Sequence, residues 1–350
     1  MSSASPSTVS LVTTPTPRPK RATVHDVAVE AGVSRGTVSR YVNGERYVSA
    51  SAREAIEAAI LKVGYVPNTA ARNLVMQRSQ AVGFIVHEPH SLFVEDPNIG
   101  EILLGANTAL SEADYQMAVL IVDSERDTER VARYLSGGLV DGVIIVSARA
   151  YDPISRVVER LNLPAAYVGH PPGASTASFV TIDNRGSARA ITERLAATGR
   201  RRIGMIAAAL DRDSGADRLA GFTEALGDRF DERLVEPVAL YSYSAGRDAM
   251  QALLERAPDV DGVFAASDAV AAGAMEALRA AGRRVPDDVG VVGFDDSAWA
   301  KRTLPGLSTV RQPAAGLGRQ AALLVLGQLR GEAGAQEVQL ESEVVWRDSA

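Results

Sequence analysis

Near the start of the chain, the apolar residues repeat with the period of an α-helix. Four of them recur at i, i+3, i+4 and i+7 and share one helical face: Val24, Val27, Ala28 and Ala31. Thr23 can cap this helix and Gly32 can end it, after which Ser34 can cap a second helix. A third amphipathic segment runs from about residue 50 to Val63. The pattern therefore predicts a small, all-α head.

From residue 81 the pattern changes, and short β-branched runs alternate with amphipathic helices. The expected strands are 82–86, 117–122, 143–146, 166–168, 179–182, 203–207, 234–239, 262–265, 289–292 and 338–346. The helices expected between them are 99–110, 129–135, 154–161, 185–197, 217–226, 246–256 and 270–280. This βαβ alternation is typical of parallel sheets covered by helices on both faces. We expect an α/β protein with two doubly wound subdomains, the second series of strands starting at 179–182.

The charged residues are divided unevenly between the head and the rest of the chain. Residues 18–79 carry ten Lys or Arg and five Asp or Glu, a net charge of +5, and the remainder has a net charge of −11. A basic head on an acidic body favours a polyanion as the partner of the head. A solvated basic surface would show the same charge, so charge alone leaves both interpretations open.

Composition excludes several classes of protein. The 350 residues include no Cys and only four His, which excludes disulfide scaffolds and thiolate catalysis. We expect neither a metal nor a cofactor, and no enzyme, because phosphate-loop, dinucleotide and nucleophile-elbow motifs are absent and Asp295-Asp296 has no neighbouring nucleophile. No apolar run reaches the ~18–20 residues of a membrane span and the N-terminus lacks a signal-like apolar region, so a cytoplasmic, nucleoid-associated protein is expected.

The basic head contains the pattern of a helix-turn-helix. Its second helix begins with small polar residues, and helices of this kind present their N-terminal side chains to base edges in the major groove. Arg35 and Arg40 lie on the exposed side of that helix, which favours DNA binding over a generic three-helix bundle.

At this point the sequence resembles the LacI/GalR (lactose-repressor) family of bacterial transcription regulators. The pattern D-V-A-x-x-A-G-V-S-x-x-T-V-S-R-x-x-N is complete from Asp26 to Asn43. Shorter matches follow in the family's order at 48–50, 64–68, 182–184, 218–222, 292–296 and 307–313. The resemblance implies a DNA-binding head joined to a sensor that resembles periplasmic binding proteins.

The resemblance also implies which residues of the head touch DNA. Arg35 and Gly36 stand where family members read bases, and since Gly36 has no side chain, Arg35 should dominate. Arg40 and Asn43 are expected to support it. The other implied contacts, some to phosphates that position the head without reading sequence, are Thr23, Ser34, Thr37, Tyr65 and Asn68.

Domain boundaries follow from the same matches. We expect a disordered tail at 1–22, the DNA-binding domain at 23–67, a hinge helix and linker at 68–79, and an effector-binding and dimerisation domain at 80–350. Within the last, subdomain 1 should hold about 80–180 and 310–330, and subdomain 2 about 181–309 and 331–350. The resemblance implies that Leu74 of the hinge wedges between base pairs of the minor groove, although a core leucine is the alternative.

An effector is expected between the two subdomains. The resemblance implies Arg218 and Asp295 as its principal contacts, and a guanidinium with a carboxylate suits the vicinal hydroxyls of a polyol. A structural ion pair would use the same two residues. The resemblance adds a stacking aromatic, two residues of the preceding loop and a serine where many members have asparagine: Tyr241, Arg212, Ser214 and Ser267. Asn98-Ile99 replaces a frequent pair of aromatics, which removes one possible stacking wall.

Together these expectations describe a ligand-responsive, sequence-specific DNA-binding regulator. We expect a repressor of sugar-utilisation genes that binds a palindromic operator as a homodimer and is switched by a small molecule, expected to be a sugar. Two alternatives stay open from the residues. A sugar-acting α/β enzyme with a DNA-binding head would turn over candidate sugars, and an exported solute-binding protein would share the sensor fold but carry a signal sequence.

Overall fold

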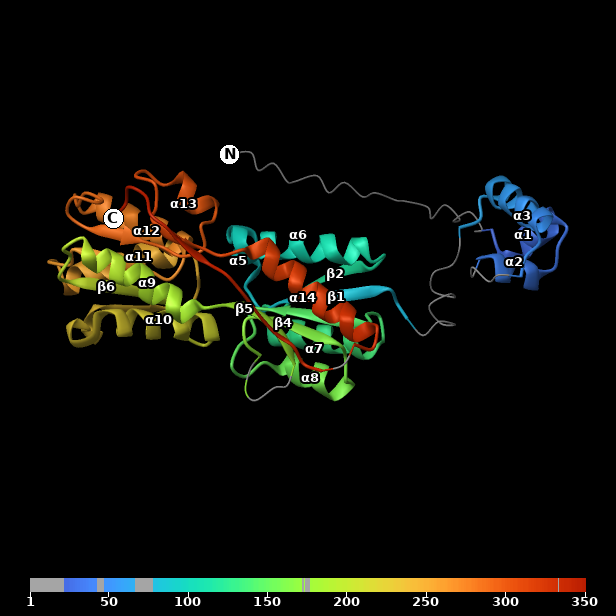
Figure 1. Cartoon of the computed structure of the whole chain (residues 1–350), viewed down its shortest axis with the longest axis horizontal. Coiled ribbons are helices and arrows are strands. Elements are labelled where there is room, and N and C mark those ends of the chain that lie inside the picture. The colour runs from blue at the N-terminus through green and yellow to red at the C-terminus, as the bar shows by residue number, and fades with distance from the viewer. Residues whose placement is uncertain (1–21, 43–46, 67–77, 172, 174–176, 333) are drawn as a thin grey trace, which may run out of the picture. The chain divides into compact units, whose positions relative to one another are not determined.

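The structure is a computed structural model of the chain, and it describes residues 22–42, 47–66, 78–171, 173, 177–332 and 334–350. It divides into two units, a head up to residue 77 and a body from residue 78 to the C-terminus, which we describe separately (Figure 1). Residues 1–21 of the tail expected at 1–22 and the hinge helix expected at 68–77 lie outside the described residues, so both stay predictions. No helix among the described residues is long and apolar enough to span a membrane.

The described residues of the head form three helices, α1 (Val24–Ala31), α2 (Arg35–Val42) and α3 (Ala50–Val63). Local chemistry fixes their ends. Thr23 and Asp26 form a reciprocal capping box at the start of α1, and Gly32 ends it in the left-handed conformation with φ 65°. The core buries one apolar face from each helix, with the residues Val27, Ala28, Val38, Ile56, Ala59 and Tyr65.

The first subdomain of the body is a six-stranded parallel sheet in the order β11-β5-β4-β3-β1-β2. Its strands are β1 (Ala81–Val86), β2 (Gln116–Ile121), β3 (Gly142–Val146), β4 (Ala165–Val168), β5 (Ser178–Ile182) and β11 (Glu337–Leu340). Helices α6 (Pro97–Glu112) and α14 (Ala314–Leu329) cover one face and α7 (Glu125–Ser136) and α8 (Pro153–Leu161) the other (Figure 1). A short helix, α5 (His90–Glu95), precedes α6.

The second subdomain has a four-stranded parallel sheet in the order β7-β6-β8-β9. These strands are β6 (Ile203–Ala208), β7 (Val235–Val238), β8 (Gly262–Ala265) and β9 (Gly290–Val292). Its helices are α9 (Asn184–Ala197), α10 (Asp213–Leu226), α11 (Tyr243–Arg256), α12 (Asp268–Ala280) and α13 (Ala298–Arg302), with two 3-10 turns at Gly227–Arg229 and Glu232–Leu234. A two-stranded antiparallel sheet of β10 (Thr309–Arg311) and β12 (Glu343–Val345) completes it. The predicted α/β class is confirmed.

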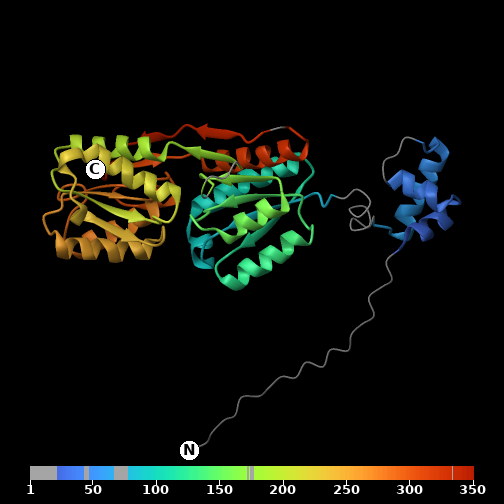
Figure 2. The same ribbon diagram turned by 90° about the horizontal axis from the view of Figure 1, so that it is seen from below.

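Two details of the predicted organisation are wrong. The strand at 178–182 does not begin the second sheet, because β5 pairs with β4 and β11 in the first. The single strand expected at 338–346 is two strands, β11 in the first sheet and β12 in the second subdomain. Residues Glu337–Leu340 therefore belong with subdomain 1, and the C-terminal segment runs along both subdomains (Figure 2). The chain passes between the subdomains three times, near residues 183, 312 and 341.

Helices α6 and α14 touch backbone to backbone. A Cβ placed on Gly105 would lie 1.9 Å from the carbonyl oxygen of Ala315, and one placed on Gly318 would lie 1.8 Å from that of Ile102. Neither position can take a larger residue without moving the backbone of the partner helix. Helix α14 was not among the predicted elements, and most of its residues are buried against the first sheet and α6.

Candidate functional site

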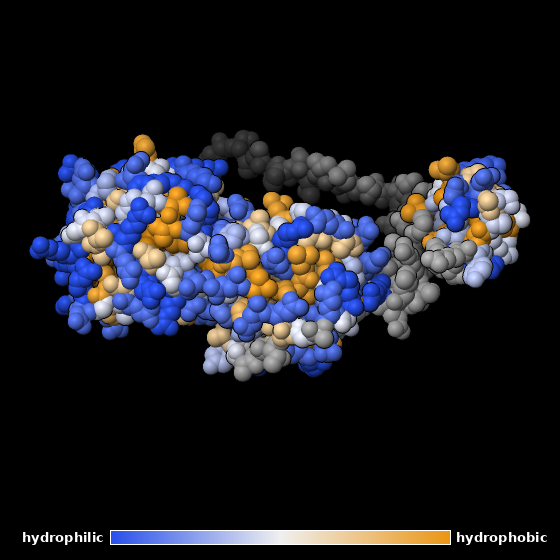
Figure 3. All heavy atoms as spheres, in the orientation of Figure 1, coloured by the Kyte–Doolittle hydropathy of each residue, from blue (hydrophilic) through white to orange (hydrophobic). Residues whose placement is uncertain are grey.

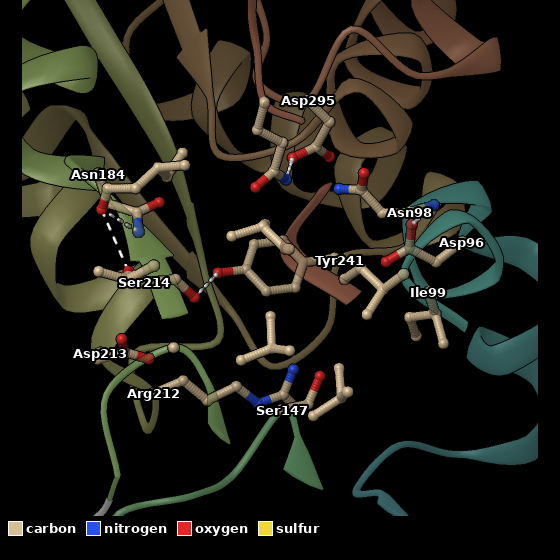
Figure 4. Close-up of a pocket in the computed structure, with 18 of the residues that line it drawn as sticks. Asp96, Asn98, Ile99, Ser147, Asn184, Arg212, Asp213, Ser214, Tyr241 and Asp295 are labelled. Atoms are coloured by element: carbon tan, nitrogen blue, oxygen red, sulfur yellow. Dashed lines mark hydrogen bonds between the residues drawn. The ribbon is translucent and has the colours of Figure 1, made fainter. Parts of the chain in front are cut away.

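A cavity lies between the two subdomains of the body, at the carboxyl ends of strands from both sheets (Figure 4). It holds about 740 Å³ of empty space, part of which is open to solvent. Open α/β sheets bind ligands at this edge because loops from several strands converge there.

Arg218 of α10 occupies one wall of this cavity and is held from several sides. Its Nε donates to Asn184 Oδ1 at 3.0 Å and its Nη1 donates to the Ala266 carbonyl at 2.6 Å. The guanidinium lies 3.7 Å from the centroid of the Phe294 ring and 3.8 Å from Asp295 Oδ1. Only about a twentieth of the residue is exposed, so its orientation is fixed before any ligand arrives.

Asp295 follows β9 and faces Arg218. Gln312 donates to its Oδ1 at 2.7 Å, and the Asn98 side chain of subdomain 1 also hydrogen-bonds to it. Asp295 has φ 118° and Asp296 has φ 55°, values that non-glycine residues rarely adopt. Arg311 and Arg347 hold the Asp296 carboxylate at 2.7 and 2.5 Å, which fixes the turn that presents Asp295.

Two carboxyl groups of the cavity have strongly raised pKa values. Burial, with Asp295 as a neighbouring negative charge, raises the pKa of Asp96 to about 8. Burial likewise raises the pKa of Asp295 to about 7, although the Arg218 guanidinium acts in the opposite direction. Each is therefore partly protonated near neutral pH, when a protonated carboxyl can donate as well as accept hydrogen bonds.

The two subdomains are joined beside the cavity by three charged pairs, all from the loop that leads into α10. Arg212 donates to both carboxylate oxygens of Glu88, with Nη2 3.0 Å from Oε2, and both side chains are almost fully buried. Asp211 lies 3.6 Å from Arg149, and Asp213 lies 3.0 Å from His170. Three successive residues of subdomain 2 thus contact three different loops of subdomain 1.

Five of the six effector residues expected from the sequence line this cavity. They are Arg212, Ser214, Arg218, Tyr241 and Asp295, which come from separate parts of the second subdomain (Figure 4). The hydroxyls of Ser214 and Tyr241 lie 3.3 Å apart, and the Tyr241 ring lies 5.6 Å from the Arg218 guanidinium. Ser267 is not among the lining residues. Its hydroxyl accepts from the backbone amide of Val270 and caps α12.

Sequence reasoning missed several polar residues of the cavity, including three from subdomain 1. The lining includes Glu88, Asp96, Asn98, Asn184, Asp213 and Gln312. Asn98 drew attention only as a departure from an aromatic, and the structure shows it as a polar group facing Asp295 (Figure 4). The position of these residues after strand ends was the one signal that could have indicated them.

In the head, the residues expected to contact DNA gather at the start of α2. Arg35 and Gly36 are exposed there, and Ser34 caps the helix by accepting from the Thr37 amide at 3.1 Å. The Ser34 and Thr37 hydroxyls also lie 2.8 Å apart. The exposed Arg40 donates from Nε to the Gly36 carbonyl at 3.3 Å, so in this structure it folds back along its own helix.

The other predicted DNA contacts are partly exposed, partly buried and partly outside the described residues. Thr23 is exposed and caps α1. Tyr65 is 8% exposed and belongs to the core of the head, which gives it a packing role that the expected phosphate contact did not include. Asn43, Asn68 and Leu74 lie outside the described residues.

Comparisons with family models match both units of the chain. The model for bacterial regulatory proteins of the lacI family matches residues 23–68, and the model for a periplasmic binding protein-like domain matches residues 192–350.

Similar proteins cover nearly the whole chain. The HTH-type transcriptional regulator CelR of Thermobifida fusca is 44% identical over 320 residues, which are 90% of this chain and 94% of CelR. A solved transcriptional regulator CelR–cellobiose complex is 40% identical, with a TM-score of 0.76, and the match covers 94% of this chain and 100% of that one. The lac repressor dimer bound to operator and the anti-inducer ONPF is 27% identical, with a TM-score of 0.82, over 94% and 99% of the two chains.

Proposed function

The chain belongs to the LacI family of bacterial regulatory proteins, and from this premise we propose that it is a sugar-responsive repressor that binds a palindromic operator as a homodimer. The family and the similar proteins are transcriptional regulators, not enzymes, which removes the alternative of a sugar-acting enzyme. In this proposal the protein acts in the cytoplasm, on the nucleoid, where its operator lies.

The observation that carries the proposal is the convergence of Arg218, Tyr241 and Asp295 in one cavity between two subdomains. A guanidinium and a carboxyl group offer paired hydrogen bonds to adjacent hydroxyls, and the tyrosine offers a face to the apolar side of a sugar ring. An effector that touches both subdomains stabilises one angle between them over others. Only such differential binding can shift a conformational equilibrium, so this position suits a switch.

We propose a β-linked disaccharide of the cellobiose type as the effector. A similar regulator, 40% identical over 94% of this chain, was solved as a cellobiose complex. The mixture of arginine, carboxyl, amide and tyrosine groups suits a ligand with many hydroxyls.

The DNA contacts proposed for the head rest on α2. Arg35 is exposed at its N-terminal end and its guanidinium can donate two parallel hydrogen bonds to guanine O6 and N7. Ser34, Thr37, Arg40 and Thr23 are proposed as supporting contacts, with Asn43, Asn68 and the Leu74 wedge carried forward as predictions. A phosphate contact by Tyr65 has to come from the small exposed part of that residue.

The homodimer is supported by apolar side chains exposed on the body. Leu104 of α6 is 63% exposed and Leu323 of α14 is 36% exposed, although the two helices are neighbours. Figure 3 shows apolar residues gathered over these helices of subdomain 1. A contiguous apolar patch of this kind is typical of protein–protein contacts. A two-fold dimer would also explain a palindromic operator.

The test is operator affinity of the full chain with and without cellobiose, at fixed salt. We expect cellobiose to change operator affinity by roughly 5–150-fold, which corresponds to a coupling of about 1–3 kcal/mol. A thermal-shift series against other disaccharides, monosaccharides and nucleobases is the companion measurement, since a true ligand at 100 times its Kd stabilises by about 2.7 kcal/mol. Stabilisation by a nucleobase and by none of the sugars would contradict the proposed effector class.

A further inference from the structure

The charges in the cavity wall carry more information than the family relationship. Two arginines line the cavity, and four carboxyl groups accompany them, from Glu88, Asp96, Asp213 and Asp295. Each arginine is already engaged by the protein. Arg218 lies against Asp295 and donates to Asn184 and Ala266, and Arg212 donates to both oxygens of Glu88. Among the lining residues, each arginine thus has a carboxyl group beside it, although the buried Nε of Arg212 has no hydrogen-bond partner.

The Glu88–Arg212 pair is the more complete of the two. Its side chains are 2% and 3% exposed, and the carboxylate accepts from two nitrogens of the same guanidinium. A guanidinium presents the same pair of donors to a phosphate as to a carboxylate, so Glu88 occupies the face of Arg212 that a phosphate would use. Glu88 comes from subdomain 1 and Arg212 from subdomain 2, so the pair also forms only when the two subdomains are together.

A sugar and its phosphate ester share a hydroxyl pattern and differ in charge. A phosphate entering this cavity would find both lining arginines already beside carboxyl groups, with the Glu88 carboxylate on the face of Arg212 that the phosphate would need. Like charges repel each other strongly at short range in a partly buried site, and specificity often rests on such a repulsive element. An uncharged sugar would meet the same groups as hydrogen-bond acceptors and donors.

We propose that Glu88 is a specificity-determining residue, which restricts the effector of this cavity to uncharged sugars by neutralising Arg212. This inference rests on the proposed sugar-responsive function and names the class of sugar. Arg212, which the sequence suggested as an effector contact, is then a positioning residue whose guanidinium closes the cavity wall.

The decisive variant is Glu88→Gln, which keeps the size of the side chain and removes its charge. Its effect is measured by isothermal titration of the full chain with cellobiose and with cellobiose 6-phosphate. In the wild type we expect cellobiose to bind at least about tenfold more tightly than its phosphate, and in Glu88→Gln we expect that ratio to shift by about tenfold or more toward the phosphate. The wild-type comparison needs no variant and so does not depend on how Glu88→Gln folds.

Asp213→Asn is the matched control. It removes a negative charge from the same wall, one residue from Arg212, but its carboxylate pairs with His170 and leaves the Glu88–Arg212 pair intact. We expect its preference between the two sugars to stay within about threefold of the wild type. Equal shifts in both variants would show a general charge effect and overturn the role of Glu88. An unchanged ratio in Glu88→Gln, or a wild type that prefers the phosphate, would overturn it too.

Inorganic phosphate separates this inference from the choice of disaccharide. If the wild type binds neither sugar, the cellobiose-type effector is wrong. Inorganic phosphate should still stabilise Glu88→Gln in a thermal-shift assay, because the Arg212 guanidinium is then free to bind it. The double variant Glu88→Gln/Arg212→Gln should lose that stabilisation. If phosphate stabilises Glu88→Gln no more than it stabilises the wild type, the assignment is overturned, whichever sugar is the effector.

Discussion

The head and the cavity of the body are built on opposite principles. In the head, the candidate contacts Ser34, Arg35, Gly36 and Thr37 are consecutive residues at the start of one exposed helix. In the body, Glu88 meets Arg212 and Asn98 meets Asp295, pairs that lie more than a hundred residues apart in the sequence. The head presents a local surface and the body encloses a space.

This difference predicts which amino-acid substitutions each unit tolerates. A local surface needs only its helix and a small core, so substitutions on it change recognition and leave folding alone. An enclosed site needs two subdomains in the correct relative orientation, buried charges that are paired, and helices whose backbones are in contact. Substitution in the body should therefore affect stability, ligand binding and conformation together.

The largest effect expected is on packing. Gly318→Ala should lower the free energy of unfolding of the body by about 2–3 kcal/mol, because the added Cβ would lie 1.8 Å from the Ile102 carbonyl oxygen. Gly316→Ala on the same helix is the control, since its Cβ would keep 3.4 Å from its nearest neighbours. Gly36→Ala in the head meets only Ser34 Oγ at 3.7 Å and should cost nothing. Calorimetry of the full chain measures all three, and equal losses at 316 and 318 would contradict the packing argument.

The next effect is a loss of response without loss of DNA binding. Arg218→Ala removes the guanidinium of the cavity and Asp295→Asn removes the carboxylate, and each should weaken effector binding by about 2–3 kcal/mol. Operator affinity without effector should stay near the wild-type value, because these residues belong to the body. The measurement is operator binding with and without cellobiose. Normal effector affinity in both variants would place the effector elsewhere.

The third prediction concerns a variant that changes DNA binding and leaves effector binding unchanged, because the substituted residue lies in the head. Arg35→Ala should cost about 1–3 kcal/mol per half-site and relax the preference at one base pair, whereas the affinity for effector should not change in the absence of DNA. Binding to a set of operators, each with one base pair changed, measures this. A uniform loss across the set would identify Arg35 as a phosphate contact.

The smallest effect is on pH dependence, which should be confined to the body. Burial raises the pKa of Asp96 to about 8 and of Asp295 to about 7, and the Asp213 hydrogen bond raises the pKa of His170, with Asp217 and Glu337 also facing it. The folded body therefore holds more protons than the unfolded chain above pH 6, so its stability should fall as the pH rises from 6 to 8. Thermal unfolding at both pH values measures the fall, which should be smaller in Asp295→Asn.

Sequence reasoning worked where the determining interactions are local. The ends of α1 follow from the Thr23–Asp26 capping box and Gly32, which lie within a ten-residue window. The strands of the parallel sheets were recognisable because buried strands are continuous apolar runs. Arg218 and Asp295 were found through motifs that the family shares, and no spacing rule would have paired them.

The features that sequence reasoning missed depend on contacts between segments far apart in the sequence. The side of helix α14 that neither the sheet nor α6 covers carries the apolar Leu323 as well as Arg319, so its residues lack the amphipathic period of a surface helix. The sheet to which β5 and β11 belong depends on pairing between segments far apart in sequence. Glu88 acts through Arg212, and nothing near residue 88 in the sequence indicates its partner.

The backbone contact of α6 with α14 at Gly105 and at Gly318 also has a mechanical consequence. Because α6 and α14 touch at their backbones, they cannot slide past each other, and subdomain 1 has the stiffness of a single block. The first residues of the body are fastened to that block, since Arg78 donates to the Leu329 carbonyl at the end of α14 and the Ser79 amide donates to Asp141. When subdomain 1 rotates relative to subdomain 2 about the three crossovers, residue 78 therefore moves with it as part of a rigid body. The displacement of residue 78 is larger the farther it lies from the axis of rotation.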